Sequence, residues 1–478
     1  MIKPYVLPDL KQAQRRSKGD TTVERGVFDI PDVLRQAGQG KSYFIRTYGC
    51  QANERDSETI RGILEAMAFT PIDTMEHADV IVLNTCAIRE NAENKVFGEI
   101  GQIKRFKQTN PDLLFMVGGC MTQEEHVVNR ILSKHPQVDV LFGTHNLHRI
   151  PQLMLQAYYS KERVVEVFSK EGEIYEDLPV SRNSSSKAWV NIMYGCDKFC
   201  TYCIVPYTRG KERSRLPEDI LTEVRELAAQ GYKEVTLLGQ NVNAYGKDLD
   251  IGVDFADLLD HVAQCGIPRV RFMTSHPWDF TDRMIEVMAT QPTIMPFLHL
   301  PLESGNDAVL RIMGRRYSAE AYLDLVKRLK ARMPHLALST DIIVGFPNET
   351  EEQFIDTLKM IEQVQYDNVY SFIYSAREST PAAKMVDNVP LEDKEARLKR
   401  LNALIGTHAL AKAKAMVGQT VTVLVDGPSK KNPAIFSGYT ETNKLVNFTP
   451  IDAQPGDLVN VTIESAHTWT LQGKQVAN

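Results

Sequence analysis

Three cysteines, Cys196, Cys200 and Cys203, lie within eight consecutive residues directly after the apolar run Ala188 to Met193. Three thiolates on one short loop can bind three irons of a four-iron cluster. Such clusters usually take four cysteine ligands, so this loop would leave one iron accessible to a small molecule. The spacing therefore predicts an iron–sulfur cluster with an open coordination site.

Two other uses of these cysteines are less consistent with the sequence. The chain begins Met-Ile-Lys-Pro without a charged-then-apolar leader, so we expect a cytoplasmic protein, in which disulfides are rare. Structural zinc usually takes four ligands from two paired motifs, and no nearby His or second Cys-x-x-Cys completes such a set.

A second cysteine triplet, Cys50, Cys86 and Cys120, follows three expected strands in the first part of the chain. The strands are expected at 42–46, 78–83 and 113–117. Because the carboxyl ends of parallel strands share one edge of a sheet, the three thiols should converge and form a second cluster site. The alternative is three buried small apolar side chains. Cys265 has no such companions, and we interpret it as structural.

Composition is that of a globular protein: 478 residues, 43% apolar, 24% charged and a net charge of -6. A chain of this length should hold two or three domains. It contains no apolar run of the ~18 residues that would suggest a membrane span. The overall charge does not indicate a polyanion partner.

Strand and helix patterns divide the chain into parts. We expect a flexible N-terminal arm (1–40), an open parallel α/β sheet (41–159), a linker (160–181), a partial (β/α)6 barrel (182–412) and a small all-β barrel (415–478). The barrel strands are expected at 188–193, 234–238, 269–273, 297–302, 338–344 and 369–374. Active sites of such barrels lie at the carboxyl ends of the strands, and the Cys196 loop follows the first strand.

The C-terminal part reads as short strands separated by Gly and Pro turns. Small barrels of this kind often bind oligonucleotides, and Ser429–Lys431, Asn443–Phe448 and Trp469 supply cations and aromatic faces. A purely structural cap is the alternative. The basic loop Arg209–Arg215 could clamp a carboxylate or a phosphate, or simply be exposed.

The Cys-x-x-x-Cys-x-Tyr-Cys loop at the start of a partial barrel resembles the radical S-adenosylmethionine (SAM) enzymes. With the upstream triplet, the chain is similar to the methylthiotransferases, in particular their tRNA-modifying branch. The similar stretches are Arg46–Ser57, Asn84–Glu90, Val117–Cys120, Thr208–Glu212, Leu238–Asn243, His299–Pro301, Ser339–Pro347 and Thr468–Gly473.

The resemblance implies an enzyme that methylthiolates carbon 2 of an isopentenylated adenosine beside the tRNA anticodon. It implies two [4Fe–4S] clusters, one per cysteine triplet, together with SAM, tRNA and an electron donor such as flavodoxin or ferredoxin. The C-terminal barrel would be a TRAM domain that grips tRNA. The residues that would contact SAM are Tyr202, Gly239, Gln240, Ser304, Asp341 and Gly345.

Alternative functions remain open. Related methylthiotransferases act on threonylcarbamoyladenosine in tRNA or on an aspartate of a ribosomal protein, and a protein of another class could use its clusters to bind RNA or relay electrons without catalysis. Two residues depart from the family pattern. Ala52 replaces a usual Met, and Glu303 replaces a usual Gln, which places a possible charge beside the active site.

Overall fold

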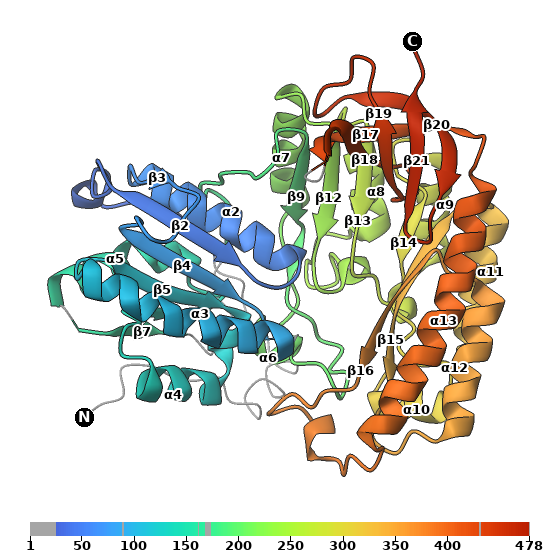
Figure 1. Cartoon of the computed structure of the whole chain (residues 1–478), viewed down its shortest axis with the longest axis horizontal. Coiled ribbons are helices and arrows are strands. Elements are labelled where there is room, and N and C mark those ends of the chain that lie inside the picture. The colour runs from blue at the N-terminus through green and yellow to red at the C-terminus, as the bar shows by residue number, and fades with distance from the viewer. Residues whose placement is uncertain (1–24, 88–89, 161, 168–173, 430–431, 478) are drawn as a thin grey trace. The chain divides into compact units, whose positions relative to one another are not determined.

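The computed structural model describes residues 25–87, 90–160, 162–167, 174–429 and 432–477, which form two compact units (Figure 1). The first unit extends to Asn183 and includes Tyr194–Phe199 and Cys203–Arg215. The second contains Ser184–Met193, Cys200–Tyr202 and Leu216–Asn478. Within the described ranges, none of the helices has the length and apolar character needed to cross a membrane.

The first unit is built on a six-stranded parallel sheet with the strand order β3-β2-β4-β5-β6-β7. Its strands are β2 (Ser42–Thr47), β3 (Thr70–Pro71), β4 (Val80–Thr85), β5 (Leu114–Gly119), β6 (Val140–Phe142) and β7 (Val164–Glu166). Its helices are α2 (Gln51–Ala66), α3 (Glu90–Thr109), α4 (Glu125–Lys134) and α5 (Ile150–Ser160), with 3-10 turns η1 (Asp32–Leu34), η2 (Cys120–Gln123) and η3 (Leu147–Arg149). The expected open parallel sheet is confirmed.

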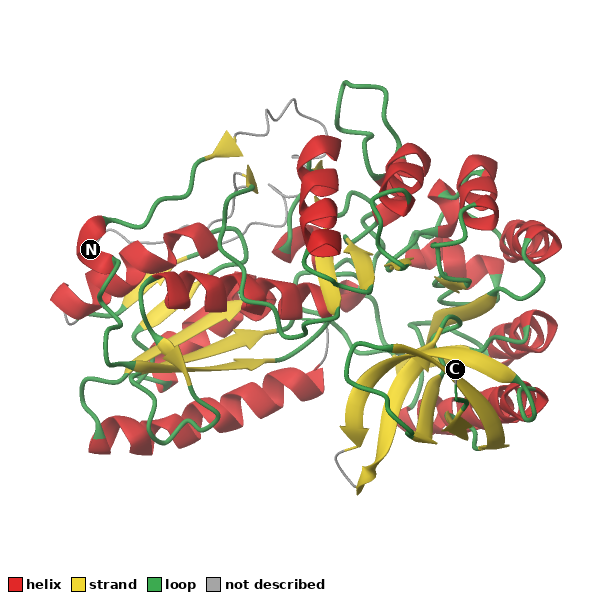
Figure 2. Ribbon diagram, turned by 90° about the horizontal axis from the view of Figure 1, so that it is seen from above, coloured by secondary structure: helices red, strands yellow, loops and turns green. Residues whose placement is uncertain are grey.

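Helices cover both faces of this sheet (Figure 2). Side chains alternate along β4: Ile81 and Leu83 pack with α3 and α4, whereas Val80 and Val82 pack with α2 and α5. Because successive side chains of a strand point to opposite faces, a strand buried on both faces is apolar throughout. The sheet is therefore a rigid support for the loops at its carboxyl edge.

Two expectations for this unit need correction. Residues 1–24 of the expected flexible arm lie outside the described residues, but Ile30 and Leu34 are 5% and 2% exposed and belong to the core beside α2 and α5. The segment expected as a linker contains β7, which pairs with β6, and β8 (Ile174–Tyr175), which pairs with β1 (Arg25–Gly26). Strands of two or three residues are too short to give a recognisable sequence pattern.

The second unit contains two three-stranded parallel sheets, β13-β12-β9 and β14-β15-β16. The strands are β9 (Lys187–Asn191), β12 (Glu234–Leu238), β13 (Arg269–Phe272), β14 (Phe297–His299), β15 (Ala337–Val344) and β16 (Asn368–Ile373). The residues before β14 continue the pairing, since the amides of Val270 and Met295 donate to the carbonyls of Thr293 and Val270. Both sheets share one apolar core, so the six strands form the expected partial barrel.

Helices alternate with these strands. They are α7 (Pro217–Ala229), α8 (Phe255–Ala263), α9 (Asp282–Thr290), α10 (Asp307–Met313), α11 (Ala319–Arg332), α12 (Glu351–Val364) and α13 (Leu391–Ala415). The shorter elements of this unit are η4 (Val242–Ala244), η5 (Pro277–Asp279) and η6 (Ala382–Lys384). By contrast, α6 (Val205–Thr208) and β11 (Arg213–Ser214) belong to the first unit, and β10 (Met193–Tyr194) stands where the chain passes from one unit to the other.

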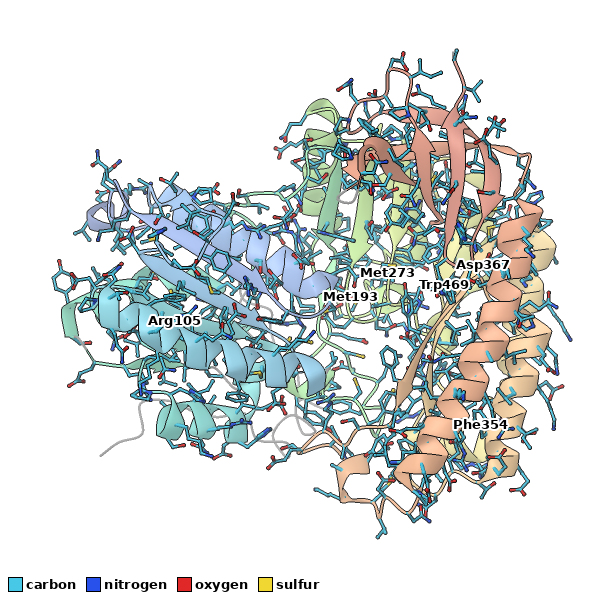
Figure 3. The ribbon with its side chains drawn as sticks, in the orientation of Figure 1. Arg105, Met193, Met273, Phe354, Asp367 and Trp469 are labelled. Atoms are coloured by element: carbon cyan, nitrogen blue, oxygen red, sulfur yellow. The ribbon has the colours of Figure 1, made fainter. Side chains whose placement is uncertain are left out.

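A closed barrel of five strands ends the chain, with the order β17-β18-β19-β21-β20. Its strands are β17 (Thr420–Ser429), β18 (Asn432–Thr440), β19 (Leu445–Thr449), β20 (Leu458–Ala466) and β21 (Thr470–Gln475). From β13, Arg269 donates to the carbonyls of Thr422 and Tyr439, both at 2.9 Å. Asp367, labelled in Figure 3, pairs with Lys412 of α13 and Lys444 of the barrel. The small barrel is thus joined to the rest of the second unit by polar contacts.

Candidate functional site

The upstream cysteines lie at the carboxyl ends of three neighbouring strands, β2, β4 and β5. Cys50 is the N-cap of α2, Cys86 directly follows β4, and Cys120 begins η2 after β5. Cys50 thus stands where the backbone N–H groups of the first turn of α2 are exposed. The strand order brings these three loops to one edge of the sheet, as the sequence predicted.

Two glycines allow the loops to approach closely. A Cβ added at Gly49 would lie 2.6 Å from the Cβ of Cys86, and one at Gly119 would lie 2.4 Å from the carbonyl oxygen of Thr85. Both glycines also have a positive φ, of 125° and 100°. Any larger residue would therefore push the cysteine loops apart.

Asn53 connects the three loops. Its Oδ1 atom lies 3.4 Å from the Sγ of Cys50 and 3.9 Å from the Sγ of Cys120, and its side-chain amide donates to the carbonyl of Thr85 at 2.8 Å. Asn84 donates to the backbone carbonyl of Asn53 at 2.8 Å. These bonds hold the backbone around the thiols in one arrangement.

A buried arginine supplies positive charge to this edge. Arg209 donates through Nε to the Sγ of Cys120 at 3.2 Å and through Nη2 to Asp56 Oδ2 at 2.6 Å. Burial raises the pKa of the Cys120 thiol to about 12, Arg209 opposes this shift, and the nearby Cys86 and Cys50 add to it. A metal bound at this thiol would displace its proton, because metal ligation requires the thiolate.

The three thiols are a donor set that an iron–sulfur cluster can use. Three thiols are soft ligands of the kind that such clusters use. Within the described ranges, no three His, Cys, Asp or Glu residues are gathered so as to hold one metal ion. In a four-iron cluster each thiolate binds a separate iron, so the ligand sulfur atoms stand farther apart than they do around one metal ion.

The downstream loop carries Cys196, Cys200 and Cys203. A Cβ added at Gly195 would lie 2.0 Å from the carbonyl oxygen of Lys211, and the Cys196 amide donates to the carbonyl of Gly210 at 3.1 Å. Cys200 is 6% exposed, and its Sγ lies 3.6 Å from Nη1 of Arg315. The backbone at Gly195 and Cys196 is thereby packed closely against that of Gly210 and Lys211.

Thr201, in the middle of the loop, belongs to the second unit and is held there by three hydrogen bonds. Its amide and hydroxyl donate to the carbonyls of Met313 and Ile312 at 2.8 and 2.9 Å, and its carbonyl accepts from the amide of Ala382 at 2.8 Å. These contacts hold the neighbouring Cys200 and Tyr202 at the ends of α10 and η6.

Three of the six residues expected to contact SAM directly follow barrel strands, and Asp341 lies within β15. Gly239 and Gln240 follow β12, and Gly345 follows β15 with a φ of 68°. The Tyr202 ring meets the edge of Phe346, with centroids 6.4 Å apart. Ser304 differs, since its hydroxyl is fully buried and lies 3.4 Å from Thr357 of α12. Its side chain therefore supports the turn.

A charged cluster surrounds Glu303, where the sequence indicated only a possible charge. Glu303 is 7% exposed and has a φ of 69°. Burial raises the pKa of its carboxyl to about 7, Asp341 adds to this shift, and Arg315 and the Tyr202 hydroxyl oppose it. The unfavourable φ is maintained by pairing, since the Glu303 amide donates to the Asp341 carbonyl at 2.9 Å and its carbonyl accepts from Ile343 at 3.0 Å.

Asp341 also faces His299 on the neighbouring strand. Nε2 of His299 lies 3.3 Å from Oδ2 of Asp341, and its Nδ1 lies 2.9 Å from the hydroxyl of Ser339. Tyr370 of β16 meets the His299 ring at 5.8 Å and is 44% exposed. The His299 ring is thus buried, with both of its nitrogens within hydrogen-bond distance of side chains of β15.

Sequence reasoning missed three of the functional neighbours: Asn53, Asp56 and Arg315. The sequence suggested that arginines of the Arg209–Arg215 loop could bind a carboxylate. In the structure two of them pair with carboxylates of the chain itself, Arg209 with Asp56 and Arg215 with Glu176. In the C-terminal barrel, Trp469 is 54% exposed (Figure 3). Lys430 and Lys431, expected to contact phosphates, lie outside the described residues.

Three family models match successive parts of the chain. They are the radical SAM superfamily over residues 190–361, a family described as uncharacterized protein family UPF0004 over 42–143, and the TRAM domain over 414–476. Among solved structures, a radical SAM methyltransferase from Kitasatospora setae is similar in fold, with a TM-score of 0.52 and 12% identity over 72% of this chain and 75% of that one. Fold and family model together define a radical SAM enzyme, a class that uses SAM and a [4Fe–4S] cluster.

Close relatives narrow this class. A tRNA-2-methylthio-N(6)-dimethylallyladenosine synthase of Anoxybacillus flavithermus is 58% identical over 99% of this chain and 90% of its own. The Bacillus subtilis protein of the same name is 56% identical over 99% and 93%. The chain belongs to the tRNA-2-methylthio-N(6)-dimethylallyladenosine synthase family.

Proposed function

We propose that this chain adds a methylthio group to carbon 2 of N6-isopentenyladenosine beside the anticodon of tRNA, in the cytoplasm. The observation that carries the proposal is the second thiol site, formed by Cys50, Cys86 and Cys120 around Asn53. A loop of three cysteines at a barrel mouth is sufficient for radical chemistry, whereas sulfur insertion needs a second site that can carry sulfur.

In this proposal Cys196, Cys200 and Cys203 hold one [4Fe–4S] cluster, and Cys50, Cys86 and Cys120 hold another. When bound, the clusters and SAM would supply the radical, the sulfur and the methyl group. An electron donor such as flavodoxin or ferredoxin would provide the reducing equivalents.

The chain's own residues would bind and orient the reactants. Tyr202, Gly239, Gln240, Asp341 and Gly345 would line the SAM site, with Ser304 shaping the turn beside it. Gly239, Gln240 and Gly345 directly follow strands of the partial barrel, which supports this assignment.

The proposal also covers the division into domains. We assign 41–159, extended by β7, to the methylthiotransferase domain, 182–412 to the radical SAM core and 415–478 to the TRAM domain. The exposed Trp469 ring would stack on a tRNA base.

Two measurements test the function. Nucleosides from tRNA of a strain lacking the gene should contain no 2-methylthio-isopentenyladenosine, and the gene should restore it. An undiminished level would overturn the substrate assignment. If the strain instead lacked methylthiolated threonylcarbamoyladenosine or the methylthiolated ribosomal aspartate, that compound would be the product of this chain.

The second measurement tests the two clusters. Anaerobically reconstituted protein should bind about eight irons, which corresponds to two four-iron clusters. Replacement of Cys50, Cys86 and Cys120 by Ala should halve the iron, retain cleavage of SAM to 5'-deoxyadenosine and abolish methylthiolation. Absence of SAM cleavage in the intact, fully loaded protein would instead favour a non-catalytic iron–sulfur protein.

A further inference from the structure

One cation lies directly against a sulfur atom of the upstream thiol site. The Arg209 guanidinium donates to the Sγ of Cys120 and the carboxylate of Asp56, and it also lies 3.3 Å from Oδ1 of Asn53. The Arg209 and Asp56 side chains are each 8% exposed. The fork of one guanidinium thus joins the sulfur, the carboxylate and the amide that organises the loops.

This arrangement is costly if it serves only to stabilise the fold. A buried ion pair loses the hydration of both charges, and an apolar pair of similar volume often gives equal or greater stability. Arg209 pairs with Asp56 through Nη2, so its Nε–H group remains directed at the sulfur of Cys120. A positive charge beside a thiolate has a function when the site carries negative charge, as a thiolate-ligated cluster does.

The chain segment that carries Arg209 is firmly seated on this edge of the first unit. Arg209 is the C-cap of α6, which begins two residues after Cys203, and its amide donates to the carbonyl of Val205 at 2.8 Å. Ile204 and Tyr207 belong to a small apolar cluster that also includes Cys120. The hydroxyl of Thr144 donates to the carbonyl of Thr208 at 2.8 Å. Contacts of the backbone around Arg209 and hydrogen bonds of its guanidinium therefore both hold this side chain in place.

We propose that Arg209 is a positioning residue that raises the reduction potential of a cluster on Cys50, Cys86 and Cys120. The proposal rests on the second cluster of the proposed function. One-electron reduction adds negative charge to the cluster, and a fixed cation with an N–H bond to a ligand sulfur stabilises that charge. Asp56 has the opposite effect, because its carboxylate offsets part of the arginine charge.

The test isolates the upstream cluster and measures its potential directly. In protein with Cys196, Cys200 and Cys203 replaced by Ala, anaerobic reconstitution should give about four irons. A redox titration with dithionite, followed by electron paramagnetic resonance, then gives the midpoint potential. Arg209→Gln should lower the reduction equilibrium constant at least tenfold, which is about 59 mV for one electron.

Asp56→Asn provides the second arm, and it should raise the midpoint potential. Opposite shifts in the two variants distinguish electrostatics from loosening of the loops, which would move both potentials in the same direction. If Arg209→Gln takes up no iron, the sign of the Asp56→Asn shift alone decides, and an unchanged or lowered potential refutes the proposal. Arg215→Gln is the matched control, because it breaks a buried pair with Glu176 in the same segment and should leave the potential unchanged.

The two proposals fail in different ways. A parent protein that binds no iron in this experiment removes the second cluster and with it the proposed function. Iron bound at full content, with potentials that do not respond to Arg209→Gln and Asp56→Asn, overturns only the role of Arg209.

Discussion

Glu303→Gln should stabilise the folded protein in a pH-dependent manner. The Glu303 carboxyl is 7% exposed, and its pKa is raised from 4.5 to about 7, mainly by burial. Because the pKa is higher in the folded than in the unfolded chain, the folded state retains a proton that the unfolded state releases. Stability therefore falls as pH rises from about 4.5 to about 7.

The size of the effect follows from the same values. A pKa change from 4.5 to about 7 corresponds to about 3 kcal/mol. This destabilisation is absent below pH 4.5 and fully present above pH 7. Glutamine resembles the neutral carboxyl and can still accept from the Tyr202 hydroxyl, so it should recover most of this energy at pH 8. For a unit as large as the second one, about 3 kcal/mol raises the melting temperature by roughly 5 °C.

The assay compares melting curves of parent and Glu303→Gln proteins at pH 5 and pH 8, followed by circular dichroism. The difference in melting temperature should be small at pH 5 and large at pH 8. Glu286→Gln is a control, since Glu286 is exposed and Arg332 lowers its pKa, so it should give a small effect of opposite sign. Equal differences for Glu303→Gln at both pH values would falsify the assignment of a raised pKa.

Three further predictions concern the thiol site and the C-terminal barrel. Gly49→Ala places a Cβ 2.6 Å from that of Cys86, so iron content should fall by about half while SAM cleavage persists; full iron content would contradict this close contact. Arg269→Met removes two bonds to barrel carbonyls, which should cost roughly 3 kcal/mol and make β17–β21 more sensitive to limited proteolysis; unchanged cleavage would show that other contacts suffice. Trp469→Ala should weaken tRNA binding about 5- to 100-fold, as expected for loss of one stacked base, with SAM cleavage unaffected.

Matched variants separate these effects from general damage. Gly231→Ala replaces a glycine with positive φ but no atom within 4 Å of the added Cβ, so it should retain both clusters. Lys474→Met breaks an exposed pair with Glu464 and should leave proteolysis unchanged. Tyr159→Ala removes a ring that is 78% exposed on α5 and should not alter tRNA affinity.

Much of the fold could be predicted from patterns that act locally. Continuous apolar runs such as Val80–Leu83 predict strands buried on both faces, and these strands lie as expected. The convergence of Cys50, Cys86 and Cys120 also followed, because carboxyl ends of parallel strands meet at one edge. Short pairings such as β7 and β8 were not predictable, since their strands form only by contact with distant strands.

The sequence by itself determined which chemistry the chain can support: two sets of three thiols, each following strand ends, with glycines where the backbone must approach closely. Only the tertiary structure decided which charges surround these thiols. Arg209 meets Cys120 across 89 positions, and Arg315 meets Cys200 across 115. The reason is physical: spacing along the chain sets local backbone geometry, whereas the burial and pairing of a charge depend on side chains that only the folded chain brings together.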